Sequence, residues 1–445
     1  MAAPAPNFHS GSGGLDNLKD FVGSNELFHR QKRKEDGRKS LRLIEAVTLH
    51  LSPTLASMSI VDYSVEHPST ELQGFYGWTD TLRGIQYGPG SVSTALPKFL
   101  KLLGASKAMV LTGKSLYEKT DVVKKIESIL KSIDGYGATF WKIGQHSPIE
   151  GIREASKIFT ETGCNIIVAV GGGSPVDAAK AILYYLQQER GGETMLQIAI
   201  PTTLSAAEYS IGAGYTDEGG KKVTVSSQKL APAAIILDAE LTLSTPERLW
   251  LSTGIRAVDH CVENLYRPLI PPPIKVLCLS ALADFFKYLP ASKADPQSVE
   301  IRQKLQIASW MSLWPIKLEK YSALGLSHSL GHKLGAAYSI PHGITSCLTL
   351  APVIELMIEI GSQRDKEYLA ETLFFLHKPS TGTVDGDIKE LSESIRRLVD
   401  DLGLRASLGE YNVPVEDVPA IAKNTLGTET HPDFAKVVKL LEGLY

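Results

Sequence analysis

A glycine triplet near the middle of the sequence has the composition of a phosphate-binding loop. It lies between an apolar run, IIVAV, and a segment that begins with Ser174, Pro175 and Asp177. Glycines let a backbone approach an anion closely, and proline fits the first turn of a helix, whose free N–H groups and dipole then point at a phosphate. The loop therefore predicts that Gly172, Gly173, Ser174 and Asp177 bind a pyrophosphate. A glycine-rich turn without a ligand is the alternative.

Two threonines follow the next apolar run. Thr202 and Thr203 come directly after the segment QIAIP, which ends at Pro201. If both apolar runs are strands of one parallel sheet, their carboxyl ends open onto the same crevice. We therefore expect the two hydroxyl groups to face the ligand of the glycine loop.

Four histidines and one arginine form a second group with chemical potential. His260 follows Arg256 by four positions, so the two side chains share one face of a helix, and His328, His332 and His342 fall within fifteen residues. Imidazole titrates near neutral pH and is a common metal ligand. A single histidine is more often structural, but this grouping indicates proton transfer or metal binding.

Alternating strands and helices position the glycine loop and the threonines. The sequence predicts strands at 108–112, 165–170 and 197–201 and helices at 117–133 and 176–188. Strands that alternate with helices imply a parallel sheet with helical crossovers. We therefore expect an α/β dinucleotide-binding domain in this part of the chain.

Beyond Asp238 the pattern becomes helical, with helices predicted at 246–266, 274–288, 299–320 and 326–338. We expect an all-α catalytic domain over 246–445, after an α/β domain over 76–245. Residues 1–75 are predicted to be a partly flexible extension. Its basic block, HRQKRKEDGRK, is interpreted as a solvated tail, with an address or a partner site as the alternative.

The charge and composition of the chain limit the classes of molecule that we expect it to bind. A formal net charge of −3 and a sequence pI near 6.4 offer no basic field for nucleic acid. No apolar run approaches the roughly 20 residues that span a bilayer, so we expect no membrane partner. Four cysteines without C-x-x-C spacing, and no signal-peptide pattern, indicate a cytoplasmic protein. A small molecule is the expected partner.

Several motifs together resemble the iron-containing (group III) alcohol dehydrogenase superfamily. They are YGPGS from Tyr87, GGGSPVDAAKAI, PTT from Pro201 and GLSHSLGHKLGAAYSIPHG from Gly325, and the resemblance runs from about residue 80 onward. It implies an NAD(P)-dependent oxidoreductase whose hydride transfer takes place between the two domains. It also implies cofactor contacts by Ser205 and Lys222, and a homodimer.

The first predicted strand bears on the choice of cofactor. Relatives that prefer NAD place an aspartate after this strand to hold the adenosine ribose, and the matching position here is Gly113. Without that carboxylate a 2′-phosphate is not repelled, and Lys114 and Ser115 can donate to it. NADPH is therefore favoured over NADH, with an ordinary turn glycine as the alternative.

The resemblance also implies a metal site, which looks incomplete. Metal-dependent relatives use an aspartate and a histidine four residues apart and two later histidines, which correspond here to Arg256, His260, His328 and His342. A permanent cation at the first position disfavours a metal, although the three histidines are the ligands if one binds. Asp259 is predicted to be a poor substitute, because it is turned about a hundred degrees away around the helix.

Maleylacetate reductases, a metal-free branch of the superfamily, are the closest in character. They too lose the aspartate, and the segment PTTLSAAEYS, with Glu208, resembles their shorter form of this motif. They carry asparagine at the position of Arg256, however, so their dicarboxylate substrate is not carried over.

These observations predict an NADPH-dependent, metal-independent reductase of a carbonyl or conjugated carbonyl compound. Arg256 would hold an oxyanion or a substrate carboxylate, His260 or His328 would donate the proton, and His332 or His342 would relay it. The alternative interpretation is that Arg256 only pairs with Asp259 or Glu263 and stabilises the helix. A metal-dependent alcohol dehydrogenase and a non-redox lyase, isomerase or cyclase are the alternative functions.

Overall fold

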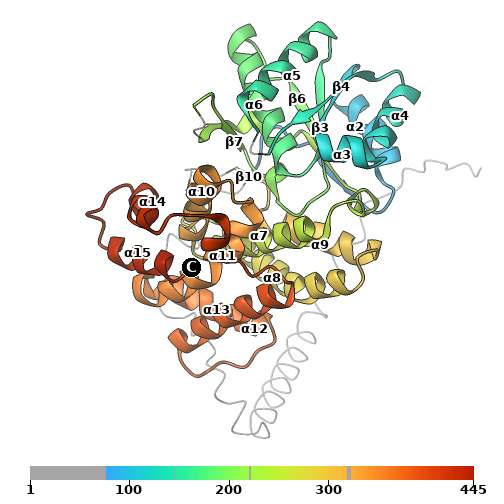
Figure 1. Ribbon diagram of the computed structural model, residues 1–445. Helices are drawn as coiled ribbons and strands as arrows, with labels where there is room; N and C mark the ends of the chain where they lie inside the picture. The colour runs from blue at the N-terminus through green and yellow to red at the C-terminus, as the bar shows by residue number, and fades with distance from the viewer. Residues whose placement is uncertain (1–76, 146, 220–221, 318–321) are drawn as a thin grey trace, which may run out of the picture. The chain divides into compact units, whose positions relative to one another are not determined.

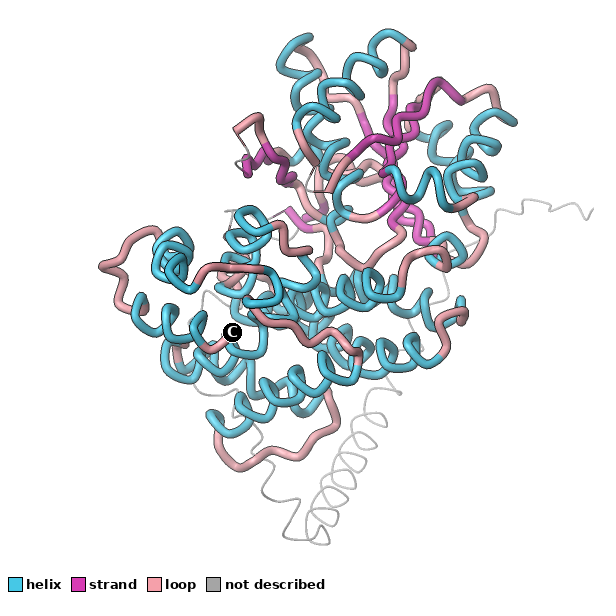
Figure 2. Tube along the Cα trace, viewed as in Figure 1, coloured by secondary structure: helices cyan, strands magenta, loops and turns pink. Residues whose placement is uncertain are grey.

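A parallel sheet of six strands forms the first half of the computed structural model, which describes residues 77–145, 147–219, 222–317 and 322–445. All five neighbouring pairs of strands are parallel (Figures 1 and 2). In order across the sheet, the strands are β2 (Gly84–Tyr87), β9 (Ala234–Leu237), β6 (Leu196–Pro201), β5 (Ile166–Gly171), β3 (Ala108–Gly113) and β4 (Tyr136–Ile143). The predicted α/β class is confirmed, and β4 is a strand that the sequence reasoning missed. The predicted extension at 1–75 lies outside the described residues.

Helices cover both faces of the sheet. Alternate residues of each strand point to opposite faces, so Val110 and Val168 pack with one helix pair while Met109 and Ile167 pack with the other. The first pair is α2 (Val92–Leu102) and α4 (Val122–Ser132), and the second is α5 (Ile149–Glu161) and α6 (Gly173–Arg190).

The register of two central strands positions the predicted loop. Gly171, at the end of β5, lies opposite Pro201, at the end of β6. Both strands therefore end level at the carboxyl edge of the sheet, with the glycine loop beside Thr202 and Thr203.

Two predicted helices are shorter than expected. The predicted helix at 117–133 is two helices, α3 (Lys114–Lys119) and α4, because Thr120 is extended and its hydroxyl accepts a hydrogen bond from the N–H of Val122 (3.3 Å). The predicted helix at 299–320 ends as α9 (Val299–Ser312), shortly before Pro315, which has no N–H to continue it.

Two small antiparallel ribbons complete the strands, and neither was predicted. The hairpin β7 (Gly212–Thr216) and β8 (Lys222–Ser226) follows the PTT segment. The ribbon of β1 (Gly77–Trp78) and β10 (Ile316–Lys317) joins residues that are far apart in the sequence.

The second half is helical, as predicted. Its helices after β9 are α7 (Glu247–Tyr266), α8 (Pro272–Ala294), α9, α10 (Leu326–Tyr338), α11 (His342–Ile360), α12 (Gln363–Phe375), α13 (Val384–Asp401), α14 (Val418–Leu426) and α15 (Phe434–Glu442) (Figure 1). The expected boundary at 245/246 falls between β9 and α7, and the division into two domains stays a prediction.

Helix α7 is enclosed on all sides. Every residue from Trp250 to Leu265 is buried, including Arg256, Asp259 and Glu263. Buried charges are costly unless they are paired and hydrogen-bonded. The charged residues of α7 therefore have to find partners inside the fold.

Helix α11 corrects one expectation. By length and composition it is able to cross a membrane, so the expectation that no apolar run approaches this length is wrong. Of the apolar stretch of this helix, 61% is buried inside the protein, and the helix packs against α7, α10 and α13. Its apolar character therefore fits a core helix.

Candidate active site

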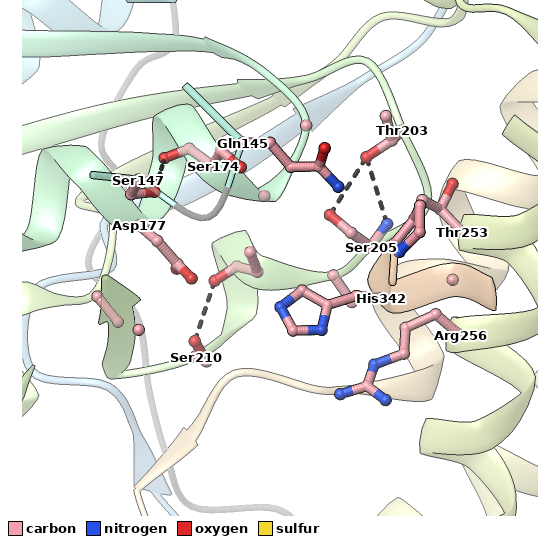
Figure 3. A pocket seen from close by; sticks show the side chains of 18 of the residues that line it. Gln145, Ser147, Ser174, Asp177, Thr203, Ser205, Ser210, Thr253, Arg256 and His342 are labelled. Atoms are coloured by element: carbon pink, nitrogen blue, oxygen red, sulfur yellow. Dashed lines mark hydrogen bonds between the residues drawn. The ribbon is translucent and has the colours of Figure 1, made fainter. Parts of the chain in front are cut away.

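A cavity of about 2040 Å³ brings the two groups of predicted residues together (Figure 3). Its lining includes the carboxyl edge of the sheet and parts of α7, α10 and α11. The predicted site residues that line it are Gly113, Lys114, Ser115, Gly172, Gly173, Ser174, Asp177, Thr202, Thr203, Ser205, Arg256, His260, His328, His332 and His342. Lys222 begins β8, and its side chain lies outside the described part of the chain.

The glycine loop forms an open cradle. Gly171 has a positive φ of 137°, and α6 begins at Gly173, so Pro175 lies in its first turn. A Cβ atom added at Gly172 would lie 3.2 Å from Cγ2 of Thr203, and one at Gly173 would lie 3.4 Å from Oγ of Ser205. No described side chain caps the first amides of α6. These N–H groups are therefore available to a phosphate, and the residues present fit a dinucleotide.

Lys180 joins this phosphate helix to the loop that carries Ser205. Its side chain is fully buried, and Nζ donates to the carbonyl oxygens of Ala207 (2.7 Å) and Gly212 (2.9 Å) and to Oγ of Ser210 (2.9 Å). Oδ1 of Asp177 lies 3.4 Å from the same nitrogen. Lys180 was not among the predicted site residues, although a lysine one turn after Asp177 was a usable signal.

The predicted ribose site lies at the end of β3. Gly113 precedes the first turn of α3, which contains Lys114 and Ser115. The side chain of Lys114 is 68% exposed and 3.9 Å from Glu118, so this surface pair leaves the ammonium group able to reach a ligand.

Arg256 and Asp259 are neighbours on α7. Nη1 of Arg256 donates to Oγ of Ser346 (3.1 Å) and lies 3.5 Å from Oδ2 of Asp259. Oδ2 of Asp259 also accepts hydrogen bonds from Ser346 (2.6 Å) and Ser327 (3.0 Å). Asp259 shares a face of α7 with Arg256, because residues three apart lie on one side of a helix. That it is turned away from His260 stays a prediction, and among the described residues Asp259 is not one that lines the cavity. The expected alternative, a pair between Arg256 and Asp259, is present.

Glu263 ties α7 to the start of α10. Its carboxylate accepts hydrogen bonds from the N–H groups of Gly325 (2.8 Å) and Ser327 (2.7 Å). A Cβ atom at Gly325 would lie 2.7 Å from Oε1 of Glu263, which explains the glycine at this position. A carboxylate at a helix N-terminus is favourable. Sequence reasoning did not place Glu263 in the site, because its partners are about sixty residues away in the chain.

His328 lies against both carboxylates. Its Nδ1 is 2.8 Å from Oε2 of Glu263 and 3.4 Å from Oδ1 of Asp259. The ring of His260 is 4.8 Å from that of His328, centroid to centroid. Among the described residues, both ring nitrogens of His328, Nδ1 of His260 and Oδ1 of Asp259 have no hydrogen-bond partner, so the close approach of His328 to the carboxylates is electrostatic.

The remaining histidines continue the series toward the open part of the cavity. The ring of His332 is 6.4 Å from that of His328 and 5.6 Å from that of His342. His332 is exposed and His342 is half-buried, whereas His260 and His328 are buried. Figure 3 shows the side chains of His342 and Arg256 pointing into the same part of the cavity.

The two buried histidines differ in protonation. Burial, together with the positive charges of His328 and Arg256, lowers the pKa of His260 well below its ordinary value. Burial and Arg256 also lower the pKa of His328, but Asp259 and Glu263 outweigh them and hold this pKa above its ordinary value. The pKa of His260 is therefore shifted toward the neutral ring and that of His328 toward the protonated ring. Burial lowers the pKa of Arg256, yet a guanidinium stays charged at neutral pH.

A group that could hold a metal ion lies within this network. Asp259, Glu263 and His328 each bring one ligand atom to within 4.8 Å of the others. It differs from the set implied by the resemblance, which joins His260, His328 and His342. Two of its members, Asp259 and Glu263, were not predicted as ligands.

Two family models match most of the chain. The model described as iron-containing alcohol dehydrogenase matches residues 83–239, and the model described as the C-terminal part of the Fe-containing alcohol dehydrogenase family matches residues 250–441.

Individual relatives in sequence and structure match the same part of the chain. Maleylacetate reductase 1 of Cupriavidus pinatubonensis is 27% identical over 340 residues, which cover 76% of this chain and 86% of the relative. The NAD-dependent methanol dehydrogenase of Bacillus methanolicus is 25% identical over 366 residues, which cover 76% and 93%. The structure of an alcohol dehydrogenase from Oenococcus oeni superposes with a TM-score of 0.75 at 22% identity, covering 83% of this chain and all of that one, and shows the shared fold.

Proposed function

The chain belongs to the iron-containing alcohol dehydrogenase family and is an NAD(P)-dependent oxidoreductase, and from this premise we propose that it is an NADPH-dependent reductase that works without a catalytic metal. The proposed substrate is a small organic molecule with a carbonyl or conjugated carbonyl group. The single observation that carries the proposal is Arg256, a buried cation on the wall of the cavity beside His260.

The position of Arg256 argues against a metal bound by the three histidines. Its guanidinium lines the same cavity as His260, His328 and His342, and it carries a charge at neutral pH. A dication among these rings would meet a like charge beside His260 and His328, which are buried, and buried charges are poorly screened.

The other possible set of metal ligands, Asp259, Glu263 and His328, already contacts other residues of the protein. Glu263 accepts three amide hydrogen bonds at the start of α10, from Gly325, Ser327 and His328, and Asp259 accepts two hydroxyl hydrogen bonds. His328 pairs with both carboxylates. The two buried carboxylates thus lie beside His328 and Arg256, which offset part of their charge, although Oδ1 of Asp259 and Nδ1 of His328 form no hydrogen bond among the described residues.

The sheet edge supplies the cofactor site. The amides at the start of α6 would hold the pyrophosphate, and the hydroxyls of Thr203 and Ser205 lie beside them. At the other end of the site, Gly113 leaves room for a 2′-phosphate, and Lys114 and Ser115 would donate to it. The bound reduced nicotinamide supplies a hydride to the carbonyl carbon of the substrate.

Arg256 and His328 would act on the carbonyl oxygen of the substrate. As the carbonyl carbon accepts the hydride, the electrons of the C=O π bond move to oxygen, and negative charge builds there. Arg256 would stabilise this charge electrostatically, the task that a Lewis acid performs in metal enzymes. His328 would supply the proton, because its two carboxylate neighbours keep it protonated while Nε2 has no described partner.

The other histidines would connect this proton source to solvent. His260 is neutral and packs against His328, so it would pass a proton rather than store one. His332 and His342 reach the open part of the cavity and would return a proton after each turnover.

The test measures cofactor and metal together. NADPH and NADH are titrated by fluorescence into protein whose iron and zinc have been quantified, and carbonyl compounds are then screened for NADPH oxidation. We expect tighter binding of NADPH than of NADH, no stoichiometric metal, and turnover in the presence of chelator. Stoichiometric metal that activity requires would refute the proposal.

The variant Arg256→Asp sharpens this test. It places a carboxylate four residues before His260, the arrangement of the metal-dependent relatives. We expect this variant to take up zinc or iron when the wild type does not. Metal content is measured by elemental analysis after dialysis, so the result does not depend on activity.

A second candidate is a metal-dependent alcohol dehydrogenase. The observation that favours it is the close approach of Asp259, Glu263 and His328. The variant Glu263→Gln separates the two proposals. If the wild type binds a metal at this group, the variant should contain less metal than the wild type; if the wild type is metal-free, the two proteins should have the same metal content.

A further inference from the structure

The backbone of the PTT loop, residues 201–205, is held by side chains of the helical half. Oγ1 of Thr253, on α7, accepts a hydrogen bond from the N–H of Leu204 (3.1 Å). Oγ of Ser309, on α9, donates to the carbonyl oxygen of the same residue (3.2 Å). These partners are 49 and 105 positions away in the chain. Both backbone polar groups of Leu204 are therefore satisfied from the other half of the protein.

The side chain of Leu204 is anchored in the same half. It is fully buried and belongs to the hydrophobic core of the helices, not to either core of the sheet. A Cβ atom added at Gly254 of α7 would lie 3.3 Å from Cδ1 of Leu204, so the helix and the loop approach closely. Nε2 of Gln306, on α9, also donates to the carbonyl oxygen of Pro201 (3.3 Å). The loop is thus fixed to both α7 and α9.

The hydroxyl group of Thr253 has a defined orientation. Its hydrogen has acceptors within α7, the carbonyl oxygens of Leu249 (2.9 Å) and Trp250 (3.0 Å). A lone pair of the same oxygen is thereby left for the N–H of Leu204. One buried hydroxyl group therefore joins the helix to the loop.

Thr253 also connects the loop with the residues that would act on the substrate. Arg256 follows it by three positions on α7 and His260 by seven, so the three side chains share one helix face. All three residues line the cavity, which Thr203 and Ser205 of the PTT loop line as well (Figure 3). The expected cofactor contacts and the expected substrate contacts thus meet at Thr253.

We propose that Thr253 is a positioning residue for hydride transfer. Through the N–H of Leu204 it would fix the loop that carries Ser205 relative to Arg256. This inference rests on the proposed reductase function and adds to it a residue that acts through the backbone, without touching cofactor or substrate. The effect is large enough to measure, because a misplacement of reacting groups by about 1 Å can lower a rate about a hundredfold.

The experiment replaces the hydroxyl group by a methyl group. Thr253→Val keeps the shape of the side chain and removes the acceptor for Leu204. For a carbonyl compound found in the screen, and with saturating NADPH, kcat should fall by about tenfold or more. KM for that compound should change little, because Arg256 and His260 are intact. Thr253→Ser keeps the hydroxyl group and should restore most of the lost rate, a rescue that a loss of stability alone would not predict for folded protein.

Thr372→Val is the matched control. Thr372 is a buried threonine of α12 whose hydroxyl group donates to the carbonyl oxygen of Leu369 in its own helix (2.6 Å). It is not among the described residues that line the cavity, so its substitution should leave kcat unchanged. Circular dichroism establishes that each variant is folded. If Thr253→Val is not folded, Thr253→Cys takes its place, because a thiol is a weaker acceptor than a hydroxyl group.

The outcomes separate this proposal from the reductase proposal. An unchanged kcat in folded Thr253→Val, or an equal loss in Thr372→Val, would overturn the role of Thr253 and leave the reductase proposal standing. If the wild type binds NADPH but reduces no carbonyl compound, the reductase proposal fails. Fluorescence titration of NADPH then decides whether Thr253 holds the loop: an affinity that falls about fivefold or more in Thr253→Val and returns in Thr253→Ser supports it, and an unchanged affinity overturns it.

Discussion

Replacing the buried lysine of α6 gives a sharp test of how the cofactor site is built. Nζ of Lys180 donates to two carbonyl oxygens and also lies within hydrogen-bond distance of the Ser210 hydroxyl and of Oδ1 of Asp177. Burial lowers the pKa of Lys180, and Asp177 opposes this shift. Lys180→Met keeps the length of the side chain and removes every donor.

The expected magnitude follows from these contacts. Hydrogen bonds to a charged group contribute about 1.5–3 kcal/mol each, so three set an upper limit of roughly 4.5–9 kcal/mol. The hydroxyl of Ser210 can replace one bond, because it lies 3.1 Å from the Ala207 oxygen and 3.0 Å from the Gly212 oxygen. Removing a buried charge also relieves its desolvation. We therefore expect a net loss of about 3–5 kcal/mol, the range for breaking a buried ion pair.

Urea unfolding followed by circular dichroism measures this loss, and NADPH titration measures its effect on the site. NADPH affinity should fall by about tenfold or more, because Asp177 loses its neighbour and the loop with Ser205 loses its anchor. Lys157→Met is the matched control, since Lys157 is exposed on α5 and lies 3.8 Å from Glu161, so its loss should cost less than about 1 kcal/mol. A Lys180→Met protein as stable as this control would refute the reasoning.

Three further outcomes test separate parts of the site. Carbonyl reduction should slow as the pH rises through the raised pKa of His328, because only the protonated ring supplies a proton. Glu263→Gln removes one of the two carboxylates that raise this pKa, so the decline in rate should move to lower pH. A pH profile that this variant leaves unchanged would contradict the assignment. Gly343→Ala should lower the free energy of unfolding by about 1–3 kcal/mol in urea, because its Cβ atom would lie 2.5 Å from the carbonyl carbon of Ser252; a neutral result would mean that α7 and α11 can move apart. Lys114→Ala should weaken NADPH binding by about tenfold and leave NADH binding unchanged in fluorescence titrations, because only NADPH carries the 2′-phosphate; equal losses would count against this role.

The phosphate loop could be predicted because its parts are consecutive in the chain. An apolar strand, three glycines and a proline in the first helical turn specify a local geometry whatever packs around them. The loop and the threonines meet because both strands end at one edge of a parallel sheet, which the alternation of strands and helices already implies.

That Arg256 and His260 line the same cavity could also be predicted from the sequence, because residues four apart share a helix face. The short ribbons could not, because strands of two to five residues show little hydrophobic pattern. Strand β4 did carry an apolar signal, in Tyr136, Phe140, Trp141 and Ile143, which the sequence reasoning overlooked. Helix breaks at Thr120 and near Pro315 depended on local side-chain chemistry that the longer apolar pattern concealed.

By itself the sequence determined the family, the α/β and helical halves, the phosphate loop, and the presence of a cation where relatives place a metal ligand. Tertiary structure decided what that cation and its neighbours do. Asp259 meets Ser346 across 87 positions and Glu263 meets Gly325 across 62, so only the packing of α7 against α10 and α11 brings them together. Burial then favours the pairing, because charges removed from water are costly unless they are paired within the protein.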